Sequence, residues 1–229
     1  MKPVKHFLSG SSSEATGGEK MMEAAERARA SSMACGPRNG EGQDRAFAEE
    51  DARRRRSESG IPPRFARERL DSHPAEIAEW LEAAKGGDPS NLVVMGPSGA
   101  GKTRAAAAAI IAACEETTAL FVRSNDLMSE LKDAFNGGDS ERSVLSKYSR
   151  PRILCLDDFG KQRATPYAVE SAFNILDNRY CRERPTIVTM QYDAEGLGRK
   201  LMKEGADRET AEAIVRRVFD GSTVLSLRR

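Results

Sequence analysis

One segment of eight residues has the residue types and spacing needed to hold phosphate groups. It fits the pattern G-x-x-x-x-G-K-S/T and consists of Gly96, Pro97, Ser98, Gly99, Ala100, Gly101, Lys102 and Thr103. Such glycines let backbone N–H groups face a phosphate, the lysine neutralises the β and γ oxygens, and the hydroxyl can ligate Mg²⁺. An apolar run precedes the segment and an alanine-rich run follows it, which disfavours an ordinary glycine-rich turn. We therefore predict that the chain binds ATP or another nucleoside triphosphate.

Two adjacent carboxylates form the second group that could do chemistry. Asp157 and Asp158 directly follow the apolar run Ile153–Leu156, and α/β sheets bind ligands at the carboxyl ends of such strands. We expect Asp157 to face the Mg²⁺ shell and Asp158 to orient or deprotonate the water that attacks the γ-phosphate. The alternative, two acids that only cap the turn to Lys161, is less consistent with a phosphate loop in the same chain.

A polar position after a further strand could contact the same phosphate. The run Thr186–Thr189 predicts a strand, and Gln191 follows it. If this strand is inserted between the phosphate-loop strand and the two-acid strand, a polar side chain here meets the γ-phosphate and the attacking water. Thr189 and Gln191 are the candidates, although residues after a strand are often polar for no other reason than the turn.

Two adjacent arginines stand near the end of an expected helix. An arginine that reaches the γ-phosphate of a neighbouring subunit, an arginine finger, accelerates phosphoryl transfer. Arg216 and Arg217 would point about 100° apart, so at most one of them could serve. The residues alone leave open the alternative that both only complement the helix dipole.

The elements that must position these residues alternate between helix and strand, which predicts an α/β fold with a parallel sheet covered on both faces. We expect strands at 92–95, 119–123, 153–156, 186–189 and 223–227, and helices at 74–85, 102–115, 124–135, 140–148, 166–182, 193–203 and 207–219. The compact domain is expected to span residues 61–229. Residues 1–60 are rich in Ser, Gly, Glu and Arg and cannot bury enough apolar area to fold alone, so we expect a flexible segment that binds a partner.

Composition limits the remaining choices. The chain has 229 residues with 39% hydrophobic content, enough for one α/β core, and a formal charge of +1 excludes a global basic field for nucleic acid. The four cysteines lie far apart without a C-x-x-C pair, which is typical of free thiols in a reducing compartment. No apolar run is long enough to cross a membrane. We therefore expect a cytoplasmic protein.

Several motifs together resemble two related families, the DnaC-type bacterial helicase loaders and the IstB-type transposition helper ATPases, both in the initiator branch of the AAA+ ATPases. The resemblance covers roughly residues 61 to 227. It is carried by segments 61–65, 96–103, 126–128, 156–160, 176–180, 185–189 and 217–221.

The resemblance implies a P-loop NTPase with five strands in the order 5-1-4-3-2, Mg²⁺ as cofactor, and ATP-dependent assembly of a homo-oligomer on single-stranded DNA. It implies that Asp157 and Asp158 are the Walker B acids, that Gln191 is the sensor 1 residue beside the γ-phosphate, and that Arg217 is the arginine finger. Segment 124–150 would help line the nucleic-acid face.

Three departures from the family pattern bear on function. Sensor 1 is usually Asn, so the longer Gln191 predicts slow hydrolysis. Residues 1–60 hold only Cys35 where loaders often carry a zinc-binding cysteine cluster, so we expect no zinc. Relatives usually continue to a sensor 2 arginine, whose place would be taken by Arg228 or Arg229, or the contact is missing.

The leading hypothesis is an ATPase that loads a replicative helicase during DNA replication. A transposition helper that recruits a transposase, or an adaptor that binds nucleotide and hardly hydrolyses it, are the alternatives. A nucleoside kinase is disfavoured, because a kinase needs an acceptor pocket and a basic lid in place of paired acids and a sensor.

Overall fold

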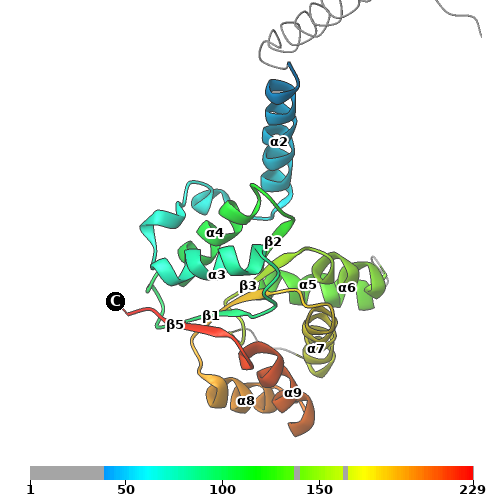
Figure 1. Ribbon diagram of the computed structural model, residues 1–229. Helices are drawn as coiled ribbons and strands as arrows, with labels where there is room; N and C mark the ends of the chain where they lie inside the picture. The colour runs from blue at the N-terminus through cyan, green and yellow to red at the C-terminus, as the bar shows by residue number, and fades with distance from the viewer. Residues whose placement is uncertain (1–38, 137–139, 162–164, 229) are drawn as a thin grey trace, which may run out of the picture. The chain divides into compact units, whose positions relative to one another are not determined.

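The computed structural model describes residues 39–136, 140–161 and 165–228 (Figure 1). The chain divides into two compact units, residues 1–47 and 48–229, and the second unit carries the sheet. Its helices are the end of α2 (Asn39–Glu58), α3 (Ala75–Lys85), α4 (Lys102–Ala113), α5 (Ser124–Phe135), α6 (Glu141–Ser149), α7 (Pro166–Cys181), α8 (Ala194–Lys203) and α9 (Arg208–Phe219). Two short 3₁₀ turns, Pro63–Phe65 and Leu70–Ser72, precede α3.

Five parallel strands form one sheet in the order β2-β3-β4-β1-β5. The strands are β1 (Leu92–Met95), β2 (Ala119–Arg123), β3 (Ile153–Asp157), β4 (Thr186–Met190) and β5 (Thr223–Ser226). Read from β5 to β2, this is the expected order 5-1-4-3-2. The prediction of an AAA+ type α/β fold, with β4 between the phosphate-loop strand β1 and the two-acid strand β3, is confirmed.

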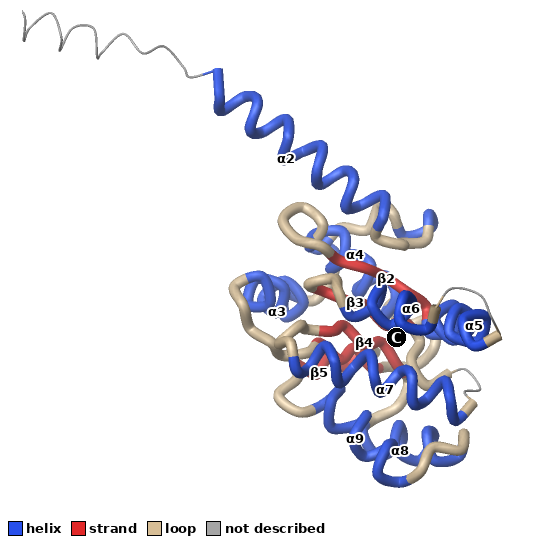
Figure 2. The backbone as a smooth tube through the Cα atoms, turned by 90° about the vertical axis from the view of Figure 1, so that its right-hand side faces the viewer, coloured by secondary structure: helices blue, strands red, loops and turns tan. Residues whose placement is uncertain are grey.

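Alternate residues of β1 to β4 enter two separate cores, because successive side chains point to opposite faces of a sheet. On one face Ile153 and Cys155 of β3 pack with α3 and α4. On the other face Leu154 and Leu156 pack with the helices α5 to α9. Figures 1 and 2 show the resulting three layers, with α3 and α4 on one side of the sheet and α7, α8 and α9 on the other.

Helix α4 is apolar on nearly all sides and lies against the sheet. Six of its residues in the run 105–110 are buried, so the helix is enclosed by α3, the sheet and the chain before α3. Its carboxyl end is covered by α2, where Arg55 Nε donates to the carbonyl of Cys114 at 2.7 Å and Arg56 pairs with Glu115 at 2.6 Å. Guanidinium groups are favourable partners there, because the last carbonyls of a helix carry partial negative charge.

The chain ahead of residue 61 also touches the sheet. Ser59 is buried, and its carbonyl accepts from the N–H of Phe121 in β2 at 2.7 Å. The division of the chain into a partner-binding segment at 1–60 and a catalytic domain at 61–229 stays a prediction. Residues 1–38, which include Cys35, lie outside the described residues, as does Arg229.

None of the helices in the described ranges combines the length and the apolar character needed to cross a membrane.

A buried arginine lies at the ends where the parallel strands begin, which we call the amino edge of the sheet. Arg179 of α7 is 1% exposed, and its guanidinium donates to the carbonyls of Tyr148, Pro151, Arg152 and Pro185 and to the hydroxyl of Thr186. None of the carboxylates in the described ranges pairs with it, and burial lowers its pKa to about 9. Arg179 therefore joins α7 to the segments that lead into β3 and β4.

We expect Arg179→Met to lower the free energy of unfolding by about 3 kcal/mol, because a side chain of similar length leaves the buried carbonyls without donors. Urea denaturation measures the change. Arg182→Ala, which removes an exposed arginine at the end of the same helix, is the control and should stay within about 0.5 kcal/mol of the wild type. Equal midpoints for Arg179→Met and the wild type would contradict the assigned role.

Candidate nucleotide-binding site

The predicted phosphate loop connects the carboxyl end of β1 to the amino end of α4. Gly96 has φ 149°, and a Cβ atom there would lie 2.4 Å from the carbonyl oxygen of Leu227. Gly101, the residue that caps α4, has φ 91°, a backbone conformation that glycine adopts without strain. Between them Pro97, Ser98 and Gly99 are exposed, and the N–H of Ala100 donates to the carbonyl of Pro97. The sequence pattern thus produces the strand–loop–helix geometry that it predicts.

Lys102 lies in the first turn of α4 and folds back over the loop. Its Nζ donates to the carbonyls of Gly96 at 2.9 Å and Pro97 at 3.0 Å, and the residue is 5% exposed. Burial lowers the pKa of Lys102, while the nearby carboxylates of Asp158 and Asp157 act in the opposite direction. The ammonium group is therefore held at the loop, where it can neutralise phosphate oxygens.

Asp157 is a buried carboxylate at the end of β3. One of its oxygens accepts from the hydroxyl of Thr103 at 2.9 Å and from the hydroxyl of Thr189 at 2.7 Å. Burial raises the pKa of Asp157, and the two hydroxyl donors oppose that rise by stabilising the charged form. The expected neighbours Thr103 and Asp157 are thus brought into direct contact across 54 residues of sequence.

Asp158 follows in a left-handed backbone conformation, with φ 55°. Its N–H donates to the hydroxyl of Thr189 at 2.9 Å, and its carboxylate pairs with Lys161 at 3.1 Å. A non-glycine residue with positive φ is held there at a cost in backbone energy, and such residues are concentrated at functional sites. The turn separates the two acids, so that Asp157 is buried while the Asp158 side chain is 37% exposed.

Thr189 is the residue of β4 that reaches both acids, and it is fully buried. Gln191, which the resemblance assigns to sensor 1, lies one residue past the end of β4 and is exposed. Its role at the γ-phosphate stays a prediction. Strand alternation places Thr189 on the same face as Ile187, the α4 face of the sheet. It does not separate Thr189 from Gln191, which lies two residues further on.

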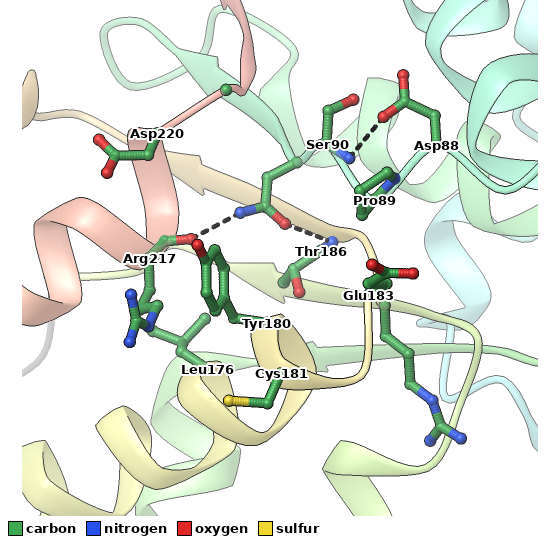
Figure 3. A pocket seen from close by; sticks show the side chains of 13 residues that line it. Asp88, Pro89, Ser90, Leu176, Tyr180, Cys181, Glu183, Thr186, Arg217 and Asp220 are labelled. Carbon is green, nitrogen blue, oxygen red and sulfur yellow. Dashed lines mark hydrogen bonds between the residues drawn. The ribbon is translucent and has the colours of Figure 1, made fainter.

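Arg217 does not join the phosphate loop of its own subunit. Asn91, which precedes β1, donates through Nδ2 to the carbonyl of Arg217 at 2.8 Å, whereas the loop follows β1 at the other end. The four residues of β1 separate the two places by about 13 Å. Figure 3 shows Arg217 beside Tyr180 in a pocket whose lining also includes Asn91, at the ends where the strands begin. The expected sensor 2 candidate Arg228 is exposed.

The contact between Thr103 and Asp157 suits a magnesium ion. Hydroxyl and carboxylate oxygens are hard ligands, and Mg²⁺ usually takes one or two protein ligands together with phosphate oxygens and water. No group of three or more His, Cys, Asp or Glu side chains suited to a metal occurs in the described part of the chain. The residues present therefore fit a metal shared with a nucleotide and do not resemble a cage made by protein alone.

Comparison with known proteins agrees with this geometry. The family model of the IstB-like ATP binding protein matches residues 75–229, which include the phosphate loop, both acids and Arg217. The chain belongs to this family.

Relatives of two kinds match part of this IstB-like chain. An insertion-sequence ATP-binding protein of Bacillus thuringiensis subsp. berliner is 33% identical over 138 residues, 60% of this chain and 53% of the relative. The replicative helicase loader DnaC of Escherichia coli K12 is 30% identical over 128 residues, 53% of this chain and 51% of the relative. The chain thus matches about half the length of these relatives.

Solved structures with the same fold include the DnaI crystal structure, with a TM-score of 0.64 at 21% identity over 73% of this chain and 95% of that one. The DnaC helicase loader structure has a TM-score of 0.59 at 21% identity and is covered completely. AMPPCP-bound DnaA from Aquifex aeolicus has a TM-score of 0.58 at 18% identity, with 73% of this chain and 51% of that one covered. The IstB-like chain therefore has an AAA+ P-loop fold.

We expect Thr189→Val to keep nucleotide affinity and to slow turnover about tenfold or more, because the isosteric change removes both hydrogen bonds that place the two acids. Thr189→Ser retains the hydroxyl and should stay near wild-type turnover. The measurement is kcat for ATP hydrolysis beside the Kd of a fluorescent ATP analogue. Equal kcat values for the valine and serine variants would show that the hydroxyl does not organise the site.

Proposed function

We propose that the protein hydrolyses ATP at the carboxyl edge of its sheet. The observation that carries this proposal is the chain of hydrogen bonds from Thr103 through Asp157 and Thr189 to the N–H of Asp158. It joins the phosphate loop to both acids in one rigid group. Such a group can hold a triphosphate and a water in a fixed relation, which is most of what phosphoryl transfer requires.

Each residue then has a distinct task. The loop N–H groups and Lys102 bind the β- and γ-phosphates, and Asp158 accepts a proton from the attacking water. The water oxygen forms a bond to the γ-phosphorus while the bond from that phosphorus to the β–γ bridging oxygen breaks, which releases ADP and phosphate. Thr103 and Asp157 would hold Mg²⁺, which when bound offsets the charge of the phosphate oxygens. The partly exposed Asp158 is the acid better placed to meet solvent water.

The arginine that the resemblance assigns to the γ-phosphate does not reach the phosphate loop of its own subunit. Arg217 lies at the amino edge of the sheet, as described above, so it can serve only the site of a second subunit. This placement supports a homo-oligomer in which Arg217 of one copy completes the site of the next. Single-stranded DNA would align the copies and raise their activity.

For the partner we propose a replicative helicase, loaded in the cytoplasm during DNA replication. The support is the 30% identity to the replicative helicase loader DnaC of Escherichia coli K12 over 128 residues. A transposition helper that recruits a transposase is the second candidate, favoured by the IstB family match and by the insertion-sequence relative. A nucleotide-switch adaptor with weak hydrolysis is the third, in line with an exposed Gln191 at the expected sensor position.

We expect Arg217→Ala to bind ATP normally and to lose turnover by about a hundredfold or more, because an arginine finger contributes mainly to the transition state. Activity of the wild type should rise more steeply than linearly with protein concentration. Arg216→Ala, which removes an exposed charge from the adjacent position of α9, is the matched control and should remain active.

A mixture of variants tests whether Arg217 acts between subunits. Lys102→Ala should not bind ATP, because it loses the charge at the β- and γ-phosphates. When it is mixed with Arg217→Ala, the intact arginine of one variant meets the intact loop of the other, and part of the turnover should return. A mixture that co-assembles and stays inactive would place Arg217 in its own subunit or in a purely structural role.

The partner is tested by affinity purification of the full-length protein from its native cells in the presence of ATP or ADP, followed by mass spectrometry. We expect a hexameric replicative helicase that is retained with ATP and released with ADP, and that is lost in Lys102→Ala. Recovery of a transposase in its place would support the transposition helper. Equal retention with either nucleotide would contradict a switch driven by ATP.

A further inference from the structure

The side chain of Arg217 is held by two residues of α7. Its Nε donates to Oδ1 of Asp177 at 2.9 Å, and its guanidinium carbon lies 4.1 Å from the centre of the Tyr180 ring. Asp177 and Tyr180 are three residues apart on α7, so they lie on the same side of that helix. Figure 3 shows the guanidinium of Arg217 beside the Tyr180 ring.

These contacts engage only part of the guanidinium group. The structure gives the two terminal nitrogens of Arg217 no hydrogen-bond partner among the described residues. Arg179, on the same helix as Asp177, is the opposite case, because all three of its nitrogens donate to oxygens of the protein and the side chain is buried. All nitrogens of Arg179 are thus engaged within the fold. Arg217 is oriented by its contacts, and its two terminal nitrogens remain available as donors.

The exposure of Tyr180 has no explanation in core packing. The residue is 55% exposed, one of few large apolar side chains in that state. It belongs to the segment Leu176–Tyr180, which carries part of the family resemblance, yet neither Tyr180 nor Asp177 contacts the phosphate loop. A contact with Arg217 gives both residues a role, since a ring face attracts a cation and a carboxylate fixes its plane.

The backbone of Arg217 is fixed as well. Asn91 donates to the Arg217 carbonyl, and its Oδ1 accepts from the N–H of Thr186 at the start of β4 at 2.8 Å. One side chain thereby ties the end of α9 to the segments leading into β1 and β4. Beside it lies an open cavity of about 470 Å³, whose lining includes Asn91, Tyr180, Arg184 and Arg217.

We propose that Asp177 and Tyr180 are positioning residues for Arg217, which hold its guanidinium so that the terminal nitrogens are free for the γ-phosphate of ATP bound to a second copy of this chain. The proposal rests on the proposed function, in which Arg217 acts between subunits. Two parallel donors match the oxygens of a phosphate. Fixing the plane beforehand removes the entropy cost of ordering a long side chain when the subunits meet.

The first test is Asp177→Asn, which keeps the shape of the side chain and removes its charge. Asp177 is 34% exposed, so the variant is expected to fold. We expect unchanged ATP affinity and unchanged assembly, with kcat reduced about tenfold, because a misoriented group contributes less to the transition state. Glu170→Gln, an exposed position two turns earlier on α7, loses the same charge and should retain full activity.

Two further measurements separate positioning from a general structural defect. Adding Asp177→Asn to Arg217→Ala should cause no further loss, because the carboxylate acts only through the arginine. Mixing Asp177→Asn with Lys102→Ala should restore turnover, because the second variant supplies a correctly held arginine to the intact loop of the first. A defect in the fold of Asp177→Asn would not be rescued in this way.

Tyr180 supplies the same test without altering any charge. Tyr180→Phe keeps the ring face and should remain near wild-type kcat, whereas Tyr180→Leu should lower kcat about threefold and should also be rescued by Lys102→Ala. If Arg217→Ala retains full activity, the proposed function itself fails. If Arg217→Ala is inactive but Asp177→Asn and Tyr180→Leu match Glu170→Gln, exceed the wild type or resist rescue, the positioning role is overturned and the arginine finger stands.

Discussion

The buried carboxylate of Asp157 determines how the strands and helices meet at the carboxyl edge of the sheet. A carboxylate removed from water needs hydrogen-bond donors to keep its charge, and Asp157 receives them from Thr103 and Thr189. These donors stand on α4 and on β4, so neither element can shift without leaving the charge unpaired. The insertion of β4 between β1 and β3 is therefore a chemical requirement of the site as well as a feature of the topology.

The two ends of the parallel strands carry different groups of the predicted site residues. Parallel strands place all their carboxyl ends on one side, where the loop and the acids lie, and all their amino ends on the other, where Asn91 and Arg217 lie. A subunit built in this way does not bring Arg217 to its own phosphate loop. In the proposed homo-oligomer, Arg217 of one subunit would reach the phosphate loop of the next, and turnover would then depend on assembly.

The sequence was sufficient to predict most of the elements, because the apolar strands and the phosphate loop carry strong local patterns. It did not distinguish Thr189 from Gln191, since positions two residues apart share a strand face and the choice depends on where β4 ends. The sequence also did not predict the role of Arg179, because the carbonyls that this arginine joins come together only in the folded chain. The end of α2 has helical composition but no apolar stripe, and its attachment uses arginines, which periodicity does not detect.

Helix α4 is held at both ends by groups from other parts of the chain. At its amino end Thr103 is bonded to Asp157, and past its carboxyl end Arg55 of α2 donates to the carbonyls of Cys114 and Glu115 at 2.7 and 2.5 Å. Because the middle of the helix is buried, it cannot bend to absorb a displacement at one end. Moving α2 away would leave those carbonyls without their donors, so α2 and α4 are expected to move together. The contacts of Arg55 thus lie at one end of a buried helix of twelve residues whose other end carries Lys102 and Thr103 of the phosphate loop.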